Sequence, residues 1–191
     1  MTAQRAQRKP RADAQRNRER LIDVARTAFA ELGPEVSLEE IARRAEVGIG
    51  TLYRHFPTRD ALVEAVFRRE VQQLADAAER LLATLSPAEA LRAWLKLFVD
   101  YMAAKKVIVA ALDPAAGGAS ALYASSGGPL RAALAQLVDA AIAGGGIRSD
   151  IEAADVLQAI VGFAQGAVGP DWQARTLRLI DVLMDGLRPP R

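Results

Sequence analysis

Residues 37–57 constrain this chain most strongly, because they predict two short helices around a tight turn. Ser37 and Glu40 have the spacing of a capping box, so we expect the first helix to begin at Leu38. The apolar residues that follow repeat at helical spacing, at Leu38, Ile41, Ala42 and Ala45. A glycine-rich turn then interrupts the pattern, and Pro57 ends the segment after it.

The second segment, residues 51–56, is barely two turns long, so neighbouring helices must hold it in place. Leu52 and Phe56 are spaced to point toward a core. The remaining side chains carry hydrogen-bond donors suited to phosphates or base edges, and they belong to Thr51, Tyr53, Arg54 and His55. This pattern is typical of a helix-turn-helix with its recognition helix.

The N-terminal end is strongly basic, although the net charge of the whole chain is only +2. Residues 1–20 hold seven Arg or Lys and two acidic residues, whereas residues 61–191 are close to neutral. The positive field therefore lies beside the predicted helix-turn-helix, which favours contact with double-stranded DNA. Residues 2–12 lack an apolar anchor, so we expect residues 1–12 to form a disordered basic arm. Such an arm is either a solvated tail or a contact with phosphates or the minor groove, and its position favours contact.

The residue types exclude several other kinds of chemistry. The chain has no cysteine and a single histidine, His55, which excludes disulfides, thiolate metal sites and histidine-clustered zinc. The acidic residues lack metal-ligand spacing, so we expect no metal, no cofactor and no enzyme. Because no apolar run reaches membrane-spanning length and no signal-peptide core is present, we expect a cytoplasmic protein without membrane contact.

The same stretch also carries a resemblance to a known family. The run IARRAEVGIGTLYRHFP, followed by TRDAL, resembles the DNA-binding signature of the TetR (tetracycline-repressor-like) family of bacterial regulators. The specific part of the match spans residues 14–74. Glu46 departs from the pattern because the family has a turn glycine there, where φ is positive. Ile49 stands where a polar residue is common, so the family's base contacts do not transfer.

The resemblance implies which residues approach DNA. They include Ser37, which caps the preceding helix, and Thr51 and Tyr53 of the recognition helix. The others are Arg59, the basic residue that opens the next helix, and Gly50, which admits close approach of the backbone. The chemistry of their side chains adds Arg54 and His55 to these candidates. The alternative for Tyr53 is a core position, and the alternative for His55 is a solvent-facing position without a contact.

Helical patterning elsewhere predicts an all-α fold of about nine helices in two domains. We expect residues 13–60 to form a three-helix DNA-binding domain with the helix-turn-helix, and residues 61–191 to form a helical domain for effector binding and dimerisation. An apolar stripe over residues 58–85 predicts one long helix that both domains share. The glycine-rich residues 115–128 are expected to be the most loop-like part of the chain.

Two features of the second domain suggest partners. A candidate effector pocket, whose residues suit a core equally well, comprises Val71, Leu74, Trp94, Phe98, Met102 and Phe163. The last two predicted helices, residues 152–168 and 171–187, carry more apolar surface than a small domain exposes. We therefore expect a homodimer built from these helices, with burial inside the monomer as the alternative.

These features together favour a sequence-specific transcriptional regulator. The preferred hypothesis is a repressor that binds a palindromic operator and leaves it when a small hydrophobic effector binds the second domain. The alternative is a constitutive DNA-binding regulator without an effector, because no pattern in the sequence proves a pocket.

Overall fold

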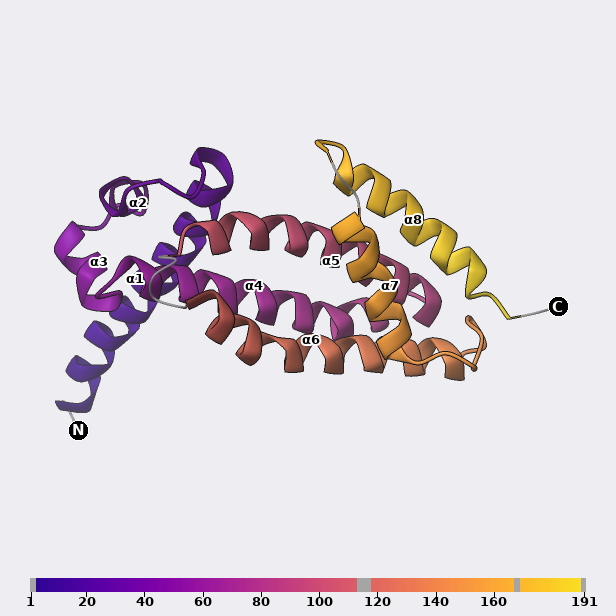
Figure 1. The fold of residues 1–191 in the computed structure, drawn as a ribbon. Coiled ribbons are helices and arrows are strands. Elements are labelled where there is room, and N and C mark those ends of the chain that lie inside the picture. The colour runs from indigo at the N-terminus through magenta and orange to yellow at the C-terminus, as the bar shows by residue number, and fades with distance from the viewer. Residues whose placement is uncertain (1–2, 113–117, 167–168, 190–191) are drawn as a thin grey trace. The chain divides into compact units, whose positions relative to one another are not determined.

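The computed structural model describes residues 3–112, 118–166 and 169–189, and these residues form an all-α fold, as predicted (Figure 1). Within them are eight helices rather than about nine: α1 (Ala3–Leu32), α2 (Leu38–Arg44), α3 (Ile49–His55), α4 (Arg59–Leu82), α5 (Pro87–Ala110), α6 (Gly118–Ala143), α7 (Ala153–Gly166) and α8 (Trp172–Gly186). The count differs because residues 87–110, whose pattern predicts a helix followed by a second short one from Lys105, form the single helix α5. Alanines at positions 103 and 104 favour continuation of the helix, and no breaker separates the two parts.

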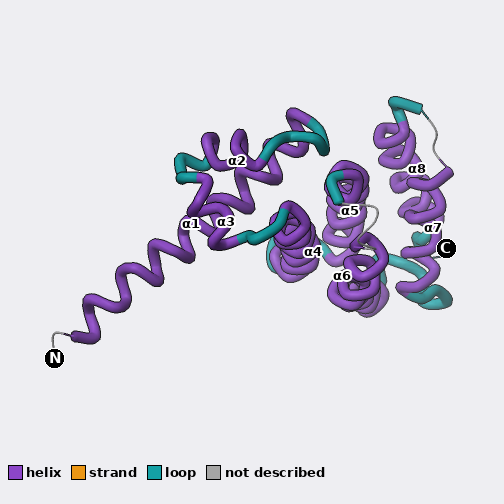
Figure 2. Tube along the Cα trace, turned by 60° about the vertical axis from the view of Figure 1, so that its left-hand side comes forward, coloured by secondary structure: helices purple, strands orange, loops and turns teal. Residues whose placement is uncertain are grey.

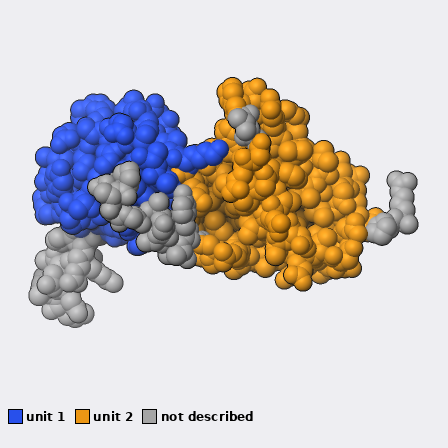
Figure 3. Space-filling model, in the orientation of Figure 1, with its two compact units in different colours: residues 1–69, 106–122 blue, residues 70–105, 123–191 orange. Residues whose placement is uncertain are grey.

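The chain divides into two compact units, each described here by itself (Figure 3). Unit 1 comprises Met1–Arg69 and Lys106–Leu122, and unit 2 comprises Glu70–Lys105 and Tyr123–Arg191. The predicted division after residue 60 therefore differs from the boundary between these units, which lies within α4. The physical reason is that Leu62, Val63 and Val66, in the first turns of α4, are fully buried in unit 1.

In unit 1 the helices α1, α2 and α3 pack on one another (Figure 2). The core is made of large apolar side chains that are almost fully buried: Leu21, Phe29, Ile41, Leu52 and Phe56. Gly33, with a φ of 86°, ends α1 in the left-handed conformation, and its N–H donates to the Phe29 carbonyl at 3.1 Å.

Residues 3–12, which we predicted to be disordered, instead form the first turns of α1. Most residues of this segment are alanine, glutamine, arginine or lysine, which are strong helix formers. Extension of a helix that is already anchored at Leu21 avoids the cost of a new nucleus. Residues 1–2 lie outside the described residues.

The predicted loop at residues 115–128 is also wrong over its described part. Residues 118–128 belong to α6, which continues through Pro129 to Ala143, and residues 115–117 lie outside the described residues. Each glycine costs a helix only about 1 kcal/mol relative to alanine, and three alanines and a leucine among these residues favour the helix.

Unit 2 joins the second part of α4 to α5, α6, α7 and α8, and α7 packs against α8. Arg92 of α5 contacts Asp181 of α8 at 3.0 Å, and Lys96 contacts the same carboxylate at 3.4 Å. The turn after α6 lies tightly against α5, because a Cβ at Gly146 would meet the Cβ of Ala88 at 2.8 Å.

Three helix starts are capped by side chains, and the one at Ser37 lies where the sequence predicts it. Ser37 Oγ accepts a hydrogen bond from the Glu40 N–H at 3.2 Å, and Thr58 Oγ1 accepts one from the Ala61 N–H at 3.1 Å. At the start of α5, the Ser86 N–H donates to the Glu89 carboxylate at 3.3 Å. These bonds satisfy N–H groups that a helix start would otherwise leave unpaired.

The turn between α2 and α3 contains a strained residue, as the sequence predicts. Glu46 has a φ of 55°, the one positive φ of a non-glycine residue among those described. An L-residue with a side chain pays roughly 1 kcal/mol or more for this conformation. The Glu46 carboxylate lies 3.7 Å from Arg20, but both side chains are mostly exposed, so this ion pair contributes little to the stability of unit 1.

We predict that Glu46→Gly stabilises unit 1 by roughly 0.5–1 kcal/mol, because glycine adopts a positive φ without strain. Denaturant unfolding measures this change. The matched control is Glu39→Gly inside α2, which should lose about 1 kcal/mol through lowered helix propensity. Equal losses for both variants would contradict the strain at Glu46.

Candidate nucleic-acid interface

The helix α3 divides into a buried side and an exposed side. Leu52 is fully buried and Phe56, its C-cap, is almost so, whereas Tyr53 is 45% exposed. Tyr53 is therefore a surface residue of unit 1, and the alternative of a core tyrosine does not apply. Thr51 and His55 are half-buried at the margins of the exposed side.

Arg54 is held along α3 rather than extended into solvent. Its Nη2 donates to Thr51 Oγ1 at 3.2 Å, and its Nε donates to the Gly50 carbonyl at 3.3 Å. These contacts bring a guanidinium, a hydroxyl and an open backbone position together on one stretch of the helix. Among the described residues, no atom lies within 4 Å of a Cβ built at Gly50, so this glycine is not required by packing within unit 1.

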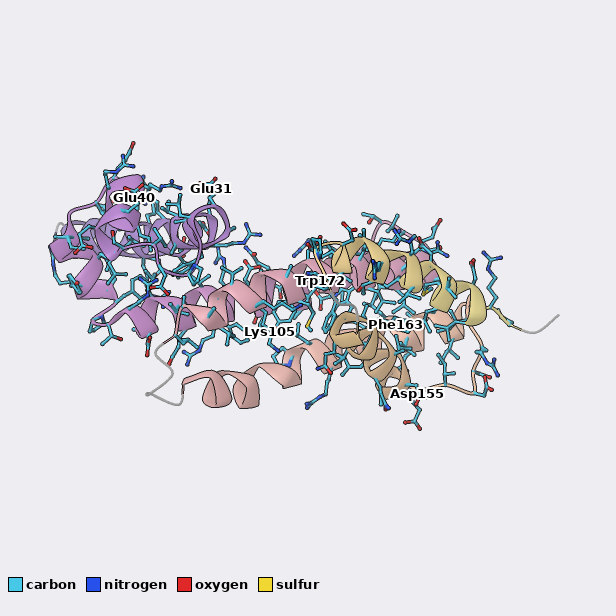
Figure 4. The ribbon with its side chains drawn as sticks, turned by 45° about the horizontal axis from the view of Figure 1, so that its top comes forward. Glu31, Glu40, Lys105, Asp155, Phe163 and Trp172 are labelled. Atoms are coloured by element: carbon cyan, nitrogen blue, oxygen red, sulfur yellow. The ribbon has the colours of Figure 1, made fainter. Side chains whose placement is uncertain are left out.

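The start of α2 is fixed by a network of charges (Figure 4). Glu40 accepts two hydrogen bonds from Arg43, both at 2.7 Å, and one from Arg44 at 2.8 Å. Arg44 also donates to Glu31 of α1 at 2.6 Å, which ties α2 to α1. The hydrogen bonds from Arg43 and Arg44 lower the pKa of Glu40 to about 2. Glu40 therefore supports α2 through these arginines. Of the two bonds of the predicted capping box, the one accepted by the Ser37 side chain is present.

Arg59, predicted from the family resemblance to contact DNA, has a different environment. Its Nη1 donates to the Val36 carbonyl at 2.7 Å, its Nη2 donates to the Pro34 carbonyl, and its Nε donates to the Ala111 carbonyl at 3.3 Å. The guanidinium also lies over the Phe29 ring, 5.5 Å from its centroid. Three backbone carbonyls thus accept hydrogen bonds from the three guanidinium nitrogens of Arg59, which favours a structural role for this side chain.

Two basic residues of α1 lie against the helix-turn-helix. The Arg18 guanidinium stacks over the Phe56 ring at 5.3 Å, and Arg20 donates to the Ala45 carbonyl at 3.4 Å. The sequence showed that this end of the chain is basic, but it could not show which arginines reach the turn and α3. Both place positive charge on the helix-turn-helix, Arg18 at the end of α3 and Arg20 at the turn before it.

The six residues of the predicted effector pocket are mainly core residues of unit 2. The indole N–H of Trp94 donates to the Leu74 carbonyl at 2.8 Å, and the rings of Trp94 and Phe98 lie 5.6 Å apart. Val71, Leu74, Trp94 and Phe98 are buried, while Met102 and Phe163 are half-buried. This arrangement is a packed interior with its polar indole satisfied.

A different cleft, which the sequence did not indicate, lies between α6 and α7 in unit 2. It has a volume of about 500 Å³ and is lined by Arg131, Leu134, Ala135, Ala153, Ala154, Leu157, Gln158 and Val161. The apolar residues that line it belong to two helices whose mutual packing no single-helix pattern reveals. Its size and its mostly apolar walls suit a small-molecule site.

Residues 3–112, 118–166 and 169–189 contain no helix that is long and apolar enough to cross a membrane. The fold and the exposed side of α3 together define a helix-turn-helix protein of the bacterial transcription-regulator class.

Comparisons with known proteins agree with this class. The family description "Bacterial regulatory proteins, tetR family" matches residues 21–66, and "Transcriptional regulator SbtR-like, C-terminal domain" matches residues 86–189. A helix-turn-helix transcriptional regulator of Staphylococcus aureus is 40% identical over 62 residues, which make up 32% of this chain and 34% of that protein. The chain thus spans about a third of the length of this curated relative.

Solved structures extend the similarity to nearly the whole chain. A TetR transcriptional regulator of Streptomyces coelicolor is 46% identical over 91% of this chain and 99% of that one, with a TM-score of 0.79. A TetR regulatory protein of Mycobacterium vanbaalenii is 38% identical over 94% and 99% of the two chains, with a TM-score of 0.73. The chain belongs to the TetR family of bacterial transcriptional regulators.

We predict that acid weakens the support that Glu40 gives to α2. Because the folded pKa is lowered from 4.5 to about 2, this contribution is fully present above pH 4.5 and is lost as the pH falls toward 2. The melting temperature of wild type should therefore exceed that of Glu40→Gln at neutral pH, and the two should converge near pH 2. Glu39→Gln, an exposed neighbour on the same turn, is the control and should cost less at neutral pH. A constant difference between wild type and Glu40→Gln at every pH would contradict the role of the carboxylate.

Proposed function

We propose that this chain is a repressor that binds a palindromic operator as a homodimer and leaves it when a small hydrophobic molecule binds. The DNA-binding part of this proposal rests on the exposed side of α3. There Tyr53, Thr51 and Arg54 offer hydrogen-bond donors, while Leu52 on the opposite side is buried in unit 1. Arg18 and Arg20 of α1 contact Phe56 and the Ala45 carbonyl of the same helix-turn-helix, and their charge suits a phosphate backbone. As such a regulator, the chain acts by binding rather than by catalysis and works in the cytoplasm, where the bacterial chromosome lies.

The phosphate and base contacts are proposed for Ser37, Gly50, Thr51, Tyr53, Arg54 and His55. The Ser37 hydroxyl already caps α2, so it holds the helix and contacts DNA through its remaining donor. Arg18 and Arg20 join these residues as phosphate contacts, in place of Arg59. Residues 3–12 form the start of α1, so the basic segment proposed to contact DNA is a helical extension rather than a disordered arm.

The homodimer is proposed to form through α7 and α8, close to the ranges predicted from the sequence. On α8, Thr176, Ile180 and Met184 are buried, whereas Val182 is 66% exposed and Leu179 is 38% exposed. On α7, Gly162 and Gly166 are exposed, and a Cβ at either would meet no described atom within 4 Å. An apolar stripe beside a glycine-lined helix face allows two pairs of helices to pack closely.

The effector site is proposed to be the cleft between α6 and α7 rather than the predicted aromatic cluster. Apolar residues form most of its wall, and Arg131 and Gln158 supply the polar groups. The Arg131 guanidinium rests over Gly127, where an added Cβ would lie 3.0 Å from Nη2. This combination suits a hydrophobic molecule with one acidic or hydrogen-bonding group.

One observation favours the alternative, a constitutive regulator without an effector. The aromatic cluster of unit 2 is packed and its Trp94 indole is paired, so it offers a ligand no polar anchor. The two functions share the same DNA-binding unit and differ only in whether the cleft binds a molecule that weakens operator affinity.

We predict that Tyr53→Phe weakens binding to an operator duplex by about 1 kcal/mol, because one phosphate hydrogen bond is lost. The melting temperature should not change, since the hydroxyl lies on an exposed side chain. Affinity is measured with a duplex selected by the full chain, over a range of salt concentrations, and should fall steeply as salt rises.

Arg59→Gln is the contrasting variant and should lose roughly 2 kcal/mol of stability, because three carbonyls lose their donor. Unchanged binding by Tyr53→Phe together with a lowered melting temperature would show that Tyr53 supports the fold instead of DNA. Salt-independent binding, or equal binding to any duplex, would refute specific recognition.

We predict that Ala135→Trp blocks the cleft, whereas Ala132→Trp, on the exposed surface of the same helix, does not. A compound from a hydrophobic library that raises the melting temperature of wild type should act equally on Ala132→Trp and lose its effect on Ala135→Trp. The same compound should lower operator affinity of wild type. If no compound in the library raises the melting temperature of wild type, the constitutive alternative is favoured.

A further inference from the structure

Ile49 is an apolar side chain that is partly exposed at the start of the recognition helix. It is the first residue of α3 and is 37% exposed, in contrast to the fully buried Leu52 three residues later. A single exposed isoleucine is ordinary on a protein surface. Ile49 differs because it shares its side of the recognition helix with the exposed Tyr53, one helical turn away.

The backbone around Ile49 is open. A Cβ built at Gly48 or at Gly50 would meet no described atom within 4 Å, so neither glycine is needed to relieve crowding inside unit 1. Neighbouring residues without side chains let the helix start approach a flat surface closely. The first residues of a recognition helix are those that face base edges in the major groove.

The chemistry of Ile49 restricts what it can recognise there. It has no hydrogen-bond donor or acceptor, so it cannot read the donor and acceptor pattern of a base pair. The distinctive apolar group in the major groove is the 5-methyl group of thymine. The nearby side chains of Arg54 and Thr51 are hydrogen-bonded to one another at 3.2 Å, so they form the polar part of this surface and Ile49 forms its apolar part.

We propose that Ile49 contacts the 5-methyl group of a thymine in each half-site and thereby selects a T·A pair at that position. The inference rests on the proposed function, because it requires α3 to lie in the major groove. Burial of one methyl group against a hydrophobic side chain changes affinity by about four-fold, so a symmetric dimer changes by about sixteen-fold.

The test begins with duplexes selected from a random library by the full chain. Each thymine of the enriched half-site is then replaced by deoxyuridine, which removes only the methyl group. At one position, wild type should lose about four-fold in affinity when one half-site carries deoxyuridine and about sixteen-fold when both do, whereas Ile49→Ala should show no loss. Replacement of that T·A pair by C·G should weaken binding, and 5-methylcytosine should restore part of the affinity.

Tyr53→Phe is the matched control on the same side of α3. It should bind every duplex more weakly but keep the full sensitivity to deoxyuridine. The contact is refuted if no thymine shows the effect, or if Ile49→Ala remains as sensitive as wild type. Failure to enrich any two-fold symmetric duplex would overturn the proposed function and this contact with it. An enriched symmetric duplex without a deoxyuridine effect would overturn the contact alone, so the two failures are distinguishable. An unchanged melting temperature of Ile49→Ala confirms that the comparison concerns binding.

Discussion

The burial of Leu52 and Phe56 is the constraint on which the rest of unit 1 depends. The helix α3 has seven residues, too few to be stable alone in water. Its position is therefore set by tertiary contacts, with Leu52 fully buried and Phe56 stacked beneath the Arg18 guanidinium at 5.3 Å. The neighbouring α2 is tied to α1 by hydrogen bonds, because Arg44 donates both to Glu31 of α1 and to Glu40 of α2. A rigid support of this kind lets one side of a very short helix carry specificity.

Much of this unit could be predicted from its sequence because local rules determine it. Ser37 caps α2 as its spacing from Glu40 predicts, and the positive φ of Glu46 follows from its place in the turn. The in-and-out pattern of Leu52 and Tyr53 also follows from helical spacing alone. By contrast, helix length was underestimated at residues 3–12 and 118–128, where good helix formers continue a helix past proline or glycine.

Features that depend on packing between distant segments could not be predicted from the sequence. Arg59 opens α4 where the resemblance suggests a DNA contact, yet the fold brings the carbonyls of Pro34, Val36 and Ala111 around it. Trp94 and Phe98 have residue types that line pockets, but a carbonyl of α4 satisfies the indole and the rings pack together. The cleft between α6 and α7 arises from the mutual arrangement of two helices, each of which has an ordinary apolar stripe on its own.

The central claim is that two copies of α3, one from each chain, read a symmetric site on one face of DNA. A hydroxyl-radical footprint on a selected duplex, combined with the stoichiometry of the complex by native mass spectrometry, tests it most directly. The account predicts two chains per duplex and two protected patches related by a two-fold axis, with centres separated by about 34–36 Å or a multiple of one helical turn. One chain on a single patch, or protection without symmetry, would contradict it.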